Sequence, residues 1–121
     1  MRDSIELPPE PRAAGTARHF VFDHVCPHVG ADVAETAMLL TSELVTNVIV
    51  HARTPMRLDV DVTDEAVRVA VVDDAARTPA IRRAHEARLT GRGMNLVETL
   101  ASQWGVEPNP PGKKVWFELS A

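Results

Sequence analysis

Hydrophobic and polar positions change period several times along the chain, and each change marks an expected element. Residues 4–7 alternate polar and apolar side chains, which predicts a short edge strand ended by the prolines that follow. Apolar residues recur at helical spacing over residues 12–25 and 33–51, so we expect two helices there. The intervening proline and glycine predict a turn, with Asp32 as the N-cap of the second helix.

The second half of the chain predicts a sheet interrupted by a loop. Residues 56–63 alternate strictly and residues 67–74 form a second strand, so the pair is typical of an antiparallel hairpin. The pattern fails over residues 75–90, which we expect to form a long loop. The remaining expected elements are a helix over residues 94–102 and strands over 103–108 and 113–120. Helices set against a largely antiparallel sheet make an α+β fold, a two-layer sandwich.

Composition narrows the class of protein. The 121 residues suggest one domain, residues 1–121. A net charge of −4 gives no sign of direct binding to nucleic acid or to an anionic membrane. The single cysteine, Cys26, cannot form an internal disulfide, so a reducing, cytoplasmic setting is expected. We find no signal peptide, and no apolar run approaches the ~20 residues of a membrane span.

Three polar residues recur every fourth position within the second expected helix. Glu43, Asn47 and His51 form a stripe beside the apolar face, where polar side chains need partners. A bound Mg²⁺–phosphate group would be one such partner, because an Asn oxygen can complete an octahedral shell. A Glu one turn earlier could orient or deprotonate an attacking hydroxyl. The alternative is a polar helix edge solvated at the rim.

Asp73 and the pair Gly91 and Gly93 can also be explained either by a bound ligand or by local structure alone. Asp73 ends a strong strand and could accept a hydrogen bond from an exocyclic amine such as that of adenine; alternatively, it is a solvated turn residue. Gly91 and Gly93 precede a helix, whose N-terminus favours phosphate; alternatively, they are ordinary loop glycines. They do not form a Walker A motif, because no G-K-[ST] follows.

Taken in this order, the motifs resemble the ATP-binding domain of the GHKL superfamily. Within it, the chain is similar to the small stand-alone anti-sigma-factor serine kinases of bacteria. SELVTNVIVHA (residues 42–52) resembles the N box, and VVDDA (71–75) the first glycine box. GRGMNLVETLASQWGV (91–106) and GKKVWFEL (112–119) resemble the second box and the closing strand. The resemblance implies the Bergerat fold, a mixed, mostly antiparallel sheet with helices on one face.

The resemblance also implies ATP and Mg²⁺ as cofactors and assigns roles by position. Asn47 would ligate Mg²⁺, Glu43 would be the general base toward a protein serine, and Asp73 would hold the adenine amine. His51 matches a position of less defined role. The other ATP-binding positions would be Ala75, Thr90, Gly91, Arg92, Gly93 and Met94, with a lid over about residues 75–92.

Two departures from the family pattern fall on the adenine side. Ala75 stands where the first box usually has glycine, and its methyl group restricts the backbone. Lys114 is the residue that we align with a small hydroxyl side chain that helps to hold a water at adenine. The Mg²⁺ and phosphate side matches the pattern.

Two functions follow. The first is an ATP-dependent serine kinase that phosphorylates an anti-anti-sigma-type partner and sequesters a sigma factor when not so engaged, with a homodimer compatible with the resemblance. The alternative is a binding module of the same fold with weak or absent nucleotide binding, which Ala75 and Lys114 favour. An unrelated α+β domain is the third reading, and the joint motif order argues against it.

Other residues carry weaker signals. Cys26 and His28 are too few for a metal site, so we expect a buried or half-buried thiol. Trp104 and Trp116 are expected to pack in the core. Five cations of the expected lid either attract triphosphate or are solvated: Arg77, Arg82, Arg83, Arg88 and Arg92.

Overall fold

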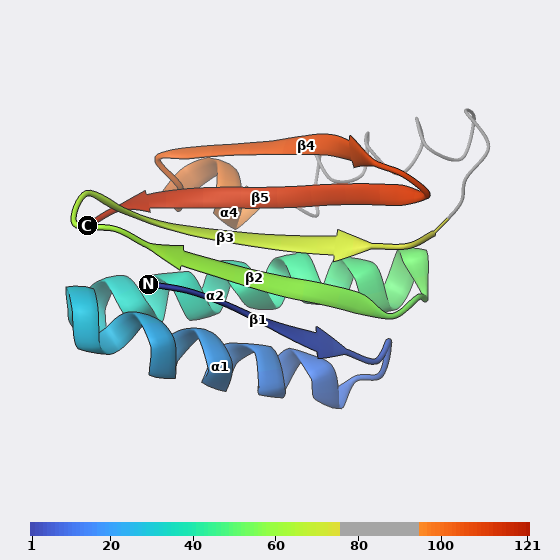
Figure 1. Cartoon of the computed structure of the whole chain (residues 1–121), viewed down its shortest axis with the longest axis horizontal. Helices are drawn as coiled ribbons and strands as arrows, with labels where there is room; N and C mark the ends of the chain where they lie inside the picture. Colours follow the sequence, from blue (N-terminus) through green and yellow to red (C-terminus); the bar gives the residue numbers. More distant parts are fainter. Residues whose placement is uncertain (76–94) are drawn as a thin grey trace.

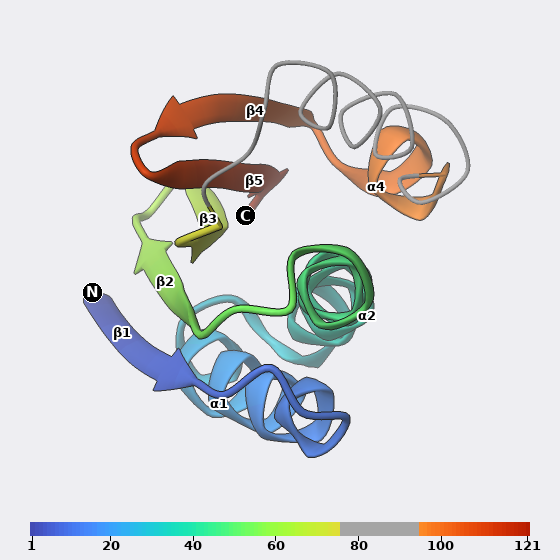
Figure 2. The same cartoon turned by 90° about the vertical axis from the view of Figure 1, so that its right-hand side faces the viewer.

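The structure, a computed structural model, describes residues 1–75 and 95–121. One five-stranded sheet has the order β1-β2-β3-β5-β4, and the helices cover one of its faces (Figures 1 and 2). The strands are β1 (Arg2–Leu7), β2 (Met56–Val62), β3 (Ala66–Asp73), β4 (Gln103–Asn109) and β5 (Gly112–Ser120). The helices are α1 (Arg12–Val29), α2 (Ala31–Asn47), the π-helical turn η1 (Val48–Ala52) and α4 (Asn95–Leu100).

The α+β sandwich predicted from the sequence is confirmed, with one correction to the sheet. All four strand pairings among the described residues are antiparallel, so the expected mixed sheet is not found there. β1 lies at the edge and pairs with β2, as predicted, although it begins two residues earlier than expected. Hairpins explain two of these pairings, because each of β2–β3 and β4–β5 is joined by a short turn that permits only antiparallel pairing.

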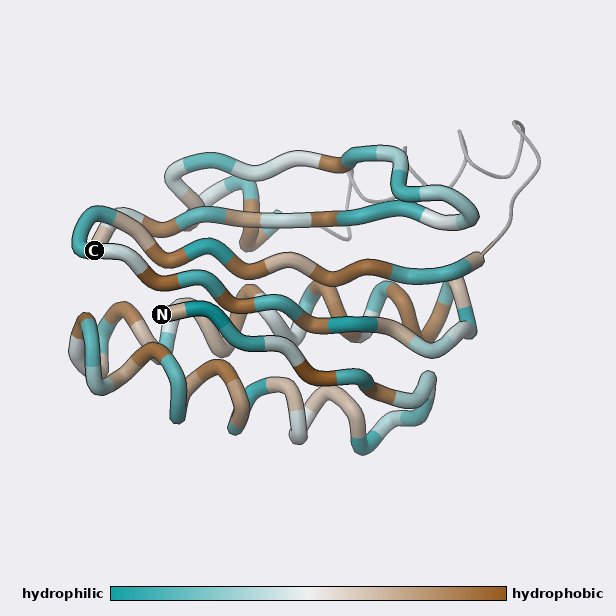
Figure 3. Tube along the Cα trace, in the orientation of Figure 1, coloured by the Kyte–Doolittle hydropathy of each residue, from teal (hydrophilic) through white to brown (hydrophobic). Residues whose placement is uncertain are grey.

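Apolar and polar side chains alternate along the strands, and the apolar ones lie on the face that the helices cover. Along β2, every second residue from Met56 to Val62 is buried. Figure 3 shows the same alternation as hydrophobic and hydrophilic bands along the strands. β3 is central and more completely buried, since Ala70 and Val72 on the helix-free face are each only 4% exposed. The long side chains of neighbouring strands must therefore cover this central strip.

Helix α2 is the core helix of the domain. It contacts α1, β3, β5 and α4. By length and composition alone, Ala31–Ala52 is apolar enough to cross a membrane, which corrects the expectation that no segment is long enough. Its apolar residues have a different explanation here, because the helix packs against both α1 and the sheet. The buried side chains are Ala34, Ala37, Leu40, Thr41, Leu44 and Val45.

The break between α1 and α2 lies later than predicted. α1 continues through Pro27 to Val29, so the expected turn before Gly30 is wrong. Gly30 ends the helix because its backbone adopts a φ of +89°, a conformation that L side chains rarely adopt. The Gly30 N–H donates to the Cys26 carbonyl at 3.0 Å. Asp32 is not the N-cap; it lies in the first turn of α2, where a carboxylate complements the helix dipole.

The end of the second helix also differs from a continuous α-helix. After Asn47 the backbone widens into η1, and the Arg53 N–H donates to the Val48 carbonyl at 2.8 Å across five residues. Arg53 then takes a left-handed φ of +57° and stops the helix. His51 therefore lies in a wider turn than the α-helical turns that carry residues 43 and 47. Such π-helical turns are frequent at functional sites.

The two tryptophans occupy different faces of the sheet. Trp104 is half-buried and packs against the core, as expected. Trp116 lies on the helix-free face, where the Arg68 guanidinium stands 4.1 Å above its ring centre, so the core prediction for Trp116 is wrong. Gly105, directly opposite on β4, leaves room for the indole, since a Cβ there would lie 2.9 Å from the indole nitrogen.

Neighbouring leucines of α2 test how much the buried face of this helix contributes to stability. Leu40 is 0% exposed and Leu39 is 45% exposed. We expect Leu40→Ala to lower the free energy of unfolding by about 2–5 kcal/mol, because it leaves a cavity in the core that α2 forms with its neighbours. The matched control, Leu39→Ala, should change it by less than about 0.5 kcal/mol. Urea denaturation measures both, and equal effects would contradict the placement of α2.

Candidate functional site

Three segments that are distant in sequence meet at one end of the sandwich. Asp73, the last residue of β3, pairs in register with Met56 at the start of β2 and with Lys113 near the start of β5. The Asp74 N–H donates to the Thr54 hydroxyl at 3.3 Å, which joins this end of β3 to the segment after η1. Figure 1 shows that the C-terminal end of α2 lies at the same end of the molecule. The end of the helix that carries Asn47 and the end of the strand that carries Asp73 therefore lie at the same end of the domain.

Asp73 is a buried carboxylate with a buried cationic partner. Its side chain is 1% exposed, so the alternative of a solvated turn residue is wrong. The Lys113 side chain is 6% exposed, and its Nζ donates to Asp73 Oδ2 at 2.5 Å. Cross-strand register explains the contact, because side chains directly opposite one another on the same face of a sheet are close neighbours.

The rest of the carboxylate is held by backbone. The Ala75 N–H donates to Asp73 Oδ1 at 3.1 Å, which fixes the turn that follows β3. Gly112 lies so close that an added Cβ would overlap the Asp73 backbone oxygen and Oδ1. Glycine is therefore required here for close approach, and the orientation of Asp73 is set from both neighbouring segments.

Lys114 does not occupy the position expected for it. It pairs with Val72 on β3 and with Glu107 on β4, whose side chains face away from the helices. Lys113, one residue earlier, is the lysine on the helix-covered face beside Asp73. Because side chains alternate along a strand, an offset of one residue moves a side chain to the opposite face. The lysine that lies beside Asp73 is therefore Lys113 and not Lys114.

The polar stripe of the N-box helix lies on the half-buried margin of α2 and η1. Glu43 and Asn47 occupy successive turns of α2, and His51 lies within η1. All three are partly exposed, and Asn47 and His51 each interact with another residue. Burial raises the pKa of the Glu43 carboxyl above its usual value. A raised pKa makes the ionised carboxylate a stronger base.

The glycine motif and the lid fall outside the described residues. This applies to five predicted site residues and to the lid arginines: Thr90, Gly91, Arg92, Gly93 and Met94, together with Arg77, Arg82, Arg83 and Arg88. The helix that follows the glycines is described from Asn95 and ends at Leu100, earlier than the predicted residue 102. α4 contacts α2, so the helix that follows the glycine motif lies against the N-box helix (Figure 2).

The comparison with protein families agrees with this arrangement. A sequence model of the histidine kinase-like ATPase domain matches residues 7–119. The chain belongs to the histidine kinase-like ATPase domain family. No curated protein matches it as a relative. Family membership and the α+β fold support an ATP-binding domain of GHKL type.

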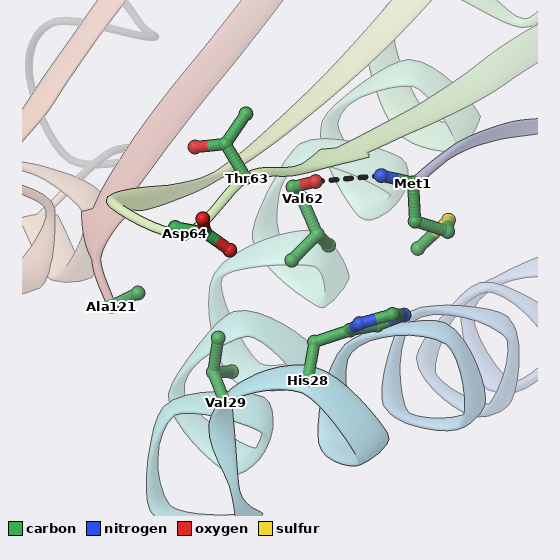
Figure 4. Close-up of a pocket in the computed structure, with 7 residues that line it drawn as sticks. All are labelled: Met1, His28, Val29, Val62, Thr63, Asp64 and Ala121. Carbon is green, nitrogen blue, oxygen red and sulfur yellow. Dashed lines mark hydrogen bonds between the residues drawn. The ribbon is translucent and has the colours of Figure 1, made fainter.

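This ATPase-type domain also has a cavity at the opposite end of its sheet (Figure 4). The cavity measures about 450 Å³ and contains none of the predicted site residues. It is lined by Met1, His28, Val29, Val62, Thr63, Asp64 and Ala121. The Met1 ammonium group donates to the Val62 carbonyl at 2.8 Å at its margin. This cavity is therefore separate from the end of the domain that carries Asp73.

The cysteine-proline-histidine segment does not gather metal ligands. Cys26 is half-buried and packs against the core, as the thiol interpretation predicts. His28 is exposed and lines the distant cavity. Within residues 1–75 and 95–121, no three His, Cys, Asp or Glu side chains are grouped as a metal site would require.

Sequence reasoning missed Lys113 as the residue that pairs with Asp73. Two adjacent lysines precede an alternating strand, and the family pattern alone aligned the second of them with the base pocket. The strand itself carried the signal, because Val115, Phe117 and Leu119 are its apolar face and residue 113 shares their parity. Counting backward from the apolar residues would have found the correct lysine.

The raised pKa of Glu43 predicts how stability depends on pH. Below the ordinary value of 4.5, this carboxyl is protonated in both the folded and the unfolded state and contributes no difference. As pH rises, the unfolded state loses its proton first, so the folded state loses relative stability until pH exceeds the folded pKa. We expect Glu43→Gln to be more stable than wild type at pH 7 and nearly equal to it at pH 3.5, measured by urea denaturation.

The control for this experiment is Glu35→Gln, which removes an exposed carboxylate from the same helix. It corrects for the general effect of removing one negative charge from α2. A Glu43→Gln protein that is less stable than wild type at pH 7, after this correction, would show that the carboxylate is stabilised rather than desolvated.

Proposed function

We propose that the protein is an ATP-dependent serine kinase of the anti-sigma type. It would transfer the γ-phosphate of Mg²⁺-ATP to a serine of an anti-anti-sigma-type partner in the cytoplasm and bind a sigma factor when not so engaged. The observation that carries the proposal is the joint placement of Asn47, Glu43 and Asp73 at one end of a histidine kinase-like ATPase domain.

The helix side has the donor atoms that a Mg²⁺–triphosphate group needs. Asn47 offers an amide oxygen and Glu43 a carboxylate on successive turns of one helix. Mg²⁺ binds oxygen ligands and retains several waters, so a small number of protein oxygens is enough. Asn47 would hold the metal, and the metal would neutralise charge on the phosphates. His51, in the widened turn beside Asn47, would lie at the edge of this group.

The base side is formed by Asp73. Its carboxylate is buried, ionically paired and held in one orientation by the Ala75 N–H and the close backbone of Gly112. A buried acceptor of fixed orientation discriminates between ligands, because a base without a matching donor would leave it unsatisfied. This role of Asp73 is the one implied by the family resemblance.

Glu43 is the candidate general base. Its pKa is raised by burial, which increases the proton affinity of the carboxylate. Phosphoryl transfer depends mainly on positioning and electrostatic stabilisation, so the side chain would orient the partner's serine and accept its proton. Its partly exposed position on α2 leaves it reachable by a second protein.

A regulatory binding module of the same fold is the second candidate. The observation that favours it is the Asp73–Lys113 ion pair, because a cation now occupies one side of the carboxylate that would hold the adenine amine. In that case the domain would act through protein contacts with its sigma-type or anti-anti-sigma-type partners, and nucleotide would bind weakly.

Calorimetric titration with Mg-ATP distinguishes the two candidates. We expect wild type to bind, and Asn47→Ala to lose at least about tenfold in affinity because a metal ligand is removed. Thr46→Ala, at the neighbouring exposed position on α2, is the matched control and should bind as wild type does. Wild type that releases no heat at millimolar Mg-ATP would favour the binding module instead.

Phosphoryl transfer tests the role of Glu43. With a purified anti-anti-sigma protein and γ-labelled ATP, we expect Glu43→Gln to bind ATP but transfer phosphate about 10²–10⁴-fold more slowly, the usual contribution of a general base. A partner whose target serine is replaced by alanine should remain unlabelled. Transfer by Glu43→Gln at the wild-type rate would show that this carboxylate is not the base.

A further inference from the structure

His24 joins helix α1 to the edge strand β1 through both of its ring nitrogens. Its Nδ1 lies 2.7 Å from the carbonyl oxygen of Phe20, one turn earlier on α1, and its Nε2 lies 2.8 Å from Asp3 Oδ2 on β1. The imidazole also lies at a tilt over the Phe20 ring, with 4.1 Å between the ring centres. The side chain is 28% exposed, so the contact lies at the half-buried margin between helix and strand.

The two contacts together require a doubly protonated ring. A carbonyl oxygen and an ionised carboxylate only accept hydrogen bonds, so each ring nitrogen must donate. A neutral imidazole carries one N–H and satisfies one such contact, whereas an imidazolium carries two. The negative face of the Phe20 ring also favours a cation beside it. The geometry at His24 is therefore that of the charged form.

Asp3 is the anionic half of this contact. Its Oδ1 accepts from the Ser4 N–H at 2.8 Å, while its Oδ2 faces His24. The bond from the Ser4 N–H, followed by the bond from His24, lowers the pKa of the Asp3 carboxyl below its ordinary value of 3.8. The stability that these bonds give is fully present above that value and is lost as pH falls through the lowered pKa. Asp3 is therefore ionised throughout the pH range in which histidines titrate.

The same carboxylate covers a backbone group at the free edge of the sheet. Met1 and Val62 exchange backbone hydrogen bonds in both directions. In this antiparallel register the N–H groups of Asp3 and Ile5 point toward β2, and that of Ser4 points to the free edge. An added strand would use the Ser4 N–H, which is instead bonded to Asp3 Oδ1. The contact with α1 thus holds the side chain that covers this edge.

The other charged groups around the ring come from three elements. From β1, the Met1 ammonium group lies on the helix side of the sheet and donates to the Val62 carbonyl. On α1, Asp23 is the preceding residue and His28 is one turn further along, and both are exposed. Asp64, in the turn after β2, lines the same cavity as His28. The β2 side chains on this face are apolar: Met56, Leu58, Val60 and Val62.

We propose that doubly protonated His24 and Asp3 form a pH-dependent latch between helix α1 and edge strand β1. In the imidazolium form, His24 bonds to both elements at once. Either tautomer of the neutral ring sets a nitrogen lone pair against an acceptor oxygen, so loss of one proton breaks one of the two bonds. The first residues of β1 then loosen and the Ser4 N–H becomes available at the edge. This latch is at the opposite end of β1 from Leu7, which pairs with Met56 beside Asp73, so it is independent of the proposed nucleotide site.

Nuclear magnetic resonance of the full chain, with ¹⁵N-labelled histidine, tests the charge of the ring. At about pH 6 we expect two ring N–H signals from His24, both protected from exchange with water, and at about pH 8.5 no more than one. His19, exposed on the same helix, is the internal comparison and should show no protected ring N–H. A His24 ring with fewer than two protected N–H protons at the lower pH would overturn the proposal.

Hydrogen exchange of the β1 amides tests the latch itself. Between about pH 6 and about pH 8.5, we expect the protection factor of the Ile5 amide to fall about two- to fivefold, the factor that an exposed ion pair usually contributes. Protection factors already correct for intrinsic exchange, and the Val69 amide of the central strand β3 corrects for changes in global stability. His19→Gln is the matched control and should show the same fall as wild type.

Asp3→Asn separates the latch from other effects of pH. The asparagine amide donates to a neutral Nε2, and its oxygen still accepts from the Ser4 N–H, so the contact persists without the second proton. We therefore expect the fall in Ile5 protection to disappear. A wild-type protection factor that does not change with pH would overturn the proposal, and so would a fall that persists in Asp3→Asn.

His24→Leu removes both ring bonds, and circular dichroism establishes that it is folded. At both pH values its Ile5 protection should equal the low value that wild type has at the higher pH. Protection as high as that of wild type at the lower pH would show that the ring does not hold β1 and would overturn the proposal. These outcomes leave the proposed function untouched, because Mg-ATP titration measures it separately.

Discussion

The buried ion pair between Asp73 and Lys113 ties the functional end of this domain to the register of its sheet. The two residues oppose each other directly across the central strands β3 and β5, so their contact exists only in the observed register. A shift of one residue would bring Lys114 to the core face and leave two charges without their partners. Removing one member of such a pair typically costs about 3–5 kcal/mol, which is a large part of the stability of a small domain. The ion pair of the Asp73 carboxylate thus favours the β3–β5 register, and that register in turn places Asp73 beside Lys113.

The periodic parts of the molecule could be predicted from the sequence because burial imposes a period. β2 alternates strictly since one of its faces meets the helices, and α2 shows helical spacing since one of its stripes meets the sheet. These two patterns, with the order of the motifs, are enough for the α+β sandwich. They also place Asp73 near the end of its strand, whereas Asn47 is the last residue of α2 and not an interior residue of a helix over residues 33–51 as expected.

The details that could not be predicted depend on backbone geometry and tertiary partners. Pro27 is a helix breaker by propensity, yet α1 continues through it to Gly30 because the last turn packs on the core through Val25 and Val29. The π-helical turn η1, which contains His51, has no local sequence signature. The burial of Asp73 could not be predicted either, because it depends on a cationic partner that lies forty residues away along the chain.

The polar residues at this end are best explained by a ligand rather than by stability. An apolar replacement at Glu43 would relieve the desolvation that raises its pKa, and a hydrophobic pair in place of Asp73 and Lys113 would often be neutral or stabilising. The opposite end of the sandwich shows that the fold does not need such groups, since β2 and β3 close there through the turn around Thr63 with backbone and hydroxyl hydrogen bonds. Groups of opposite charge gather where α2, β3 and β5 converge, and this is the end at which we propose that a charged, hydrogen-bonding ligand binds. Mg²⁺-ATP, the ligand proposed above, combines phosphate charge with a base that offers both donors and acceptors.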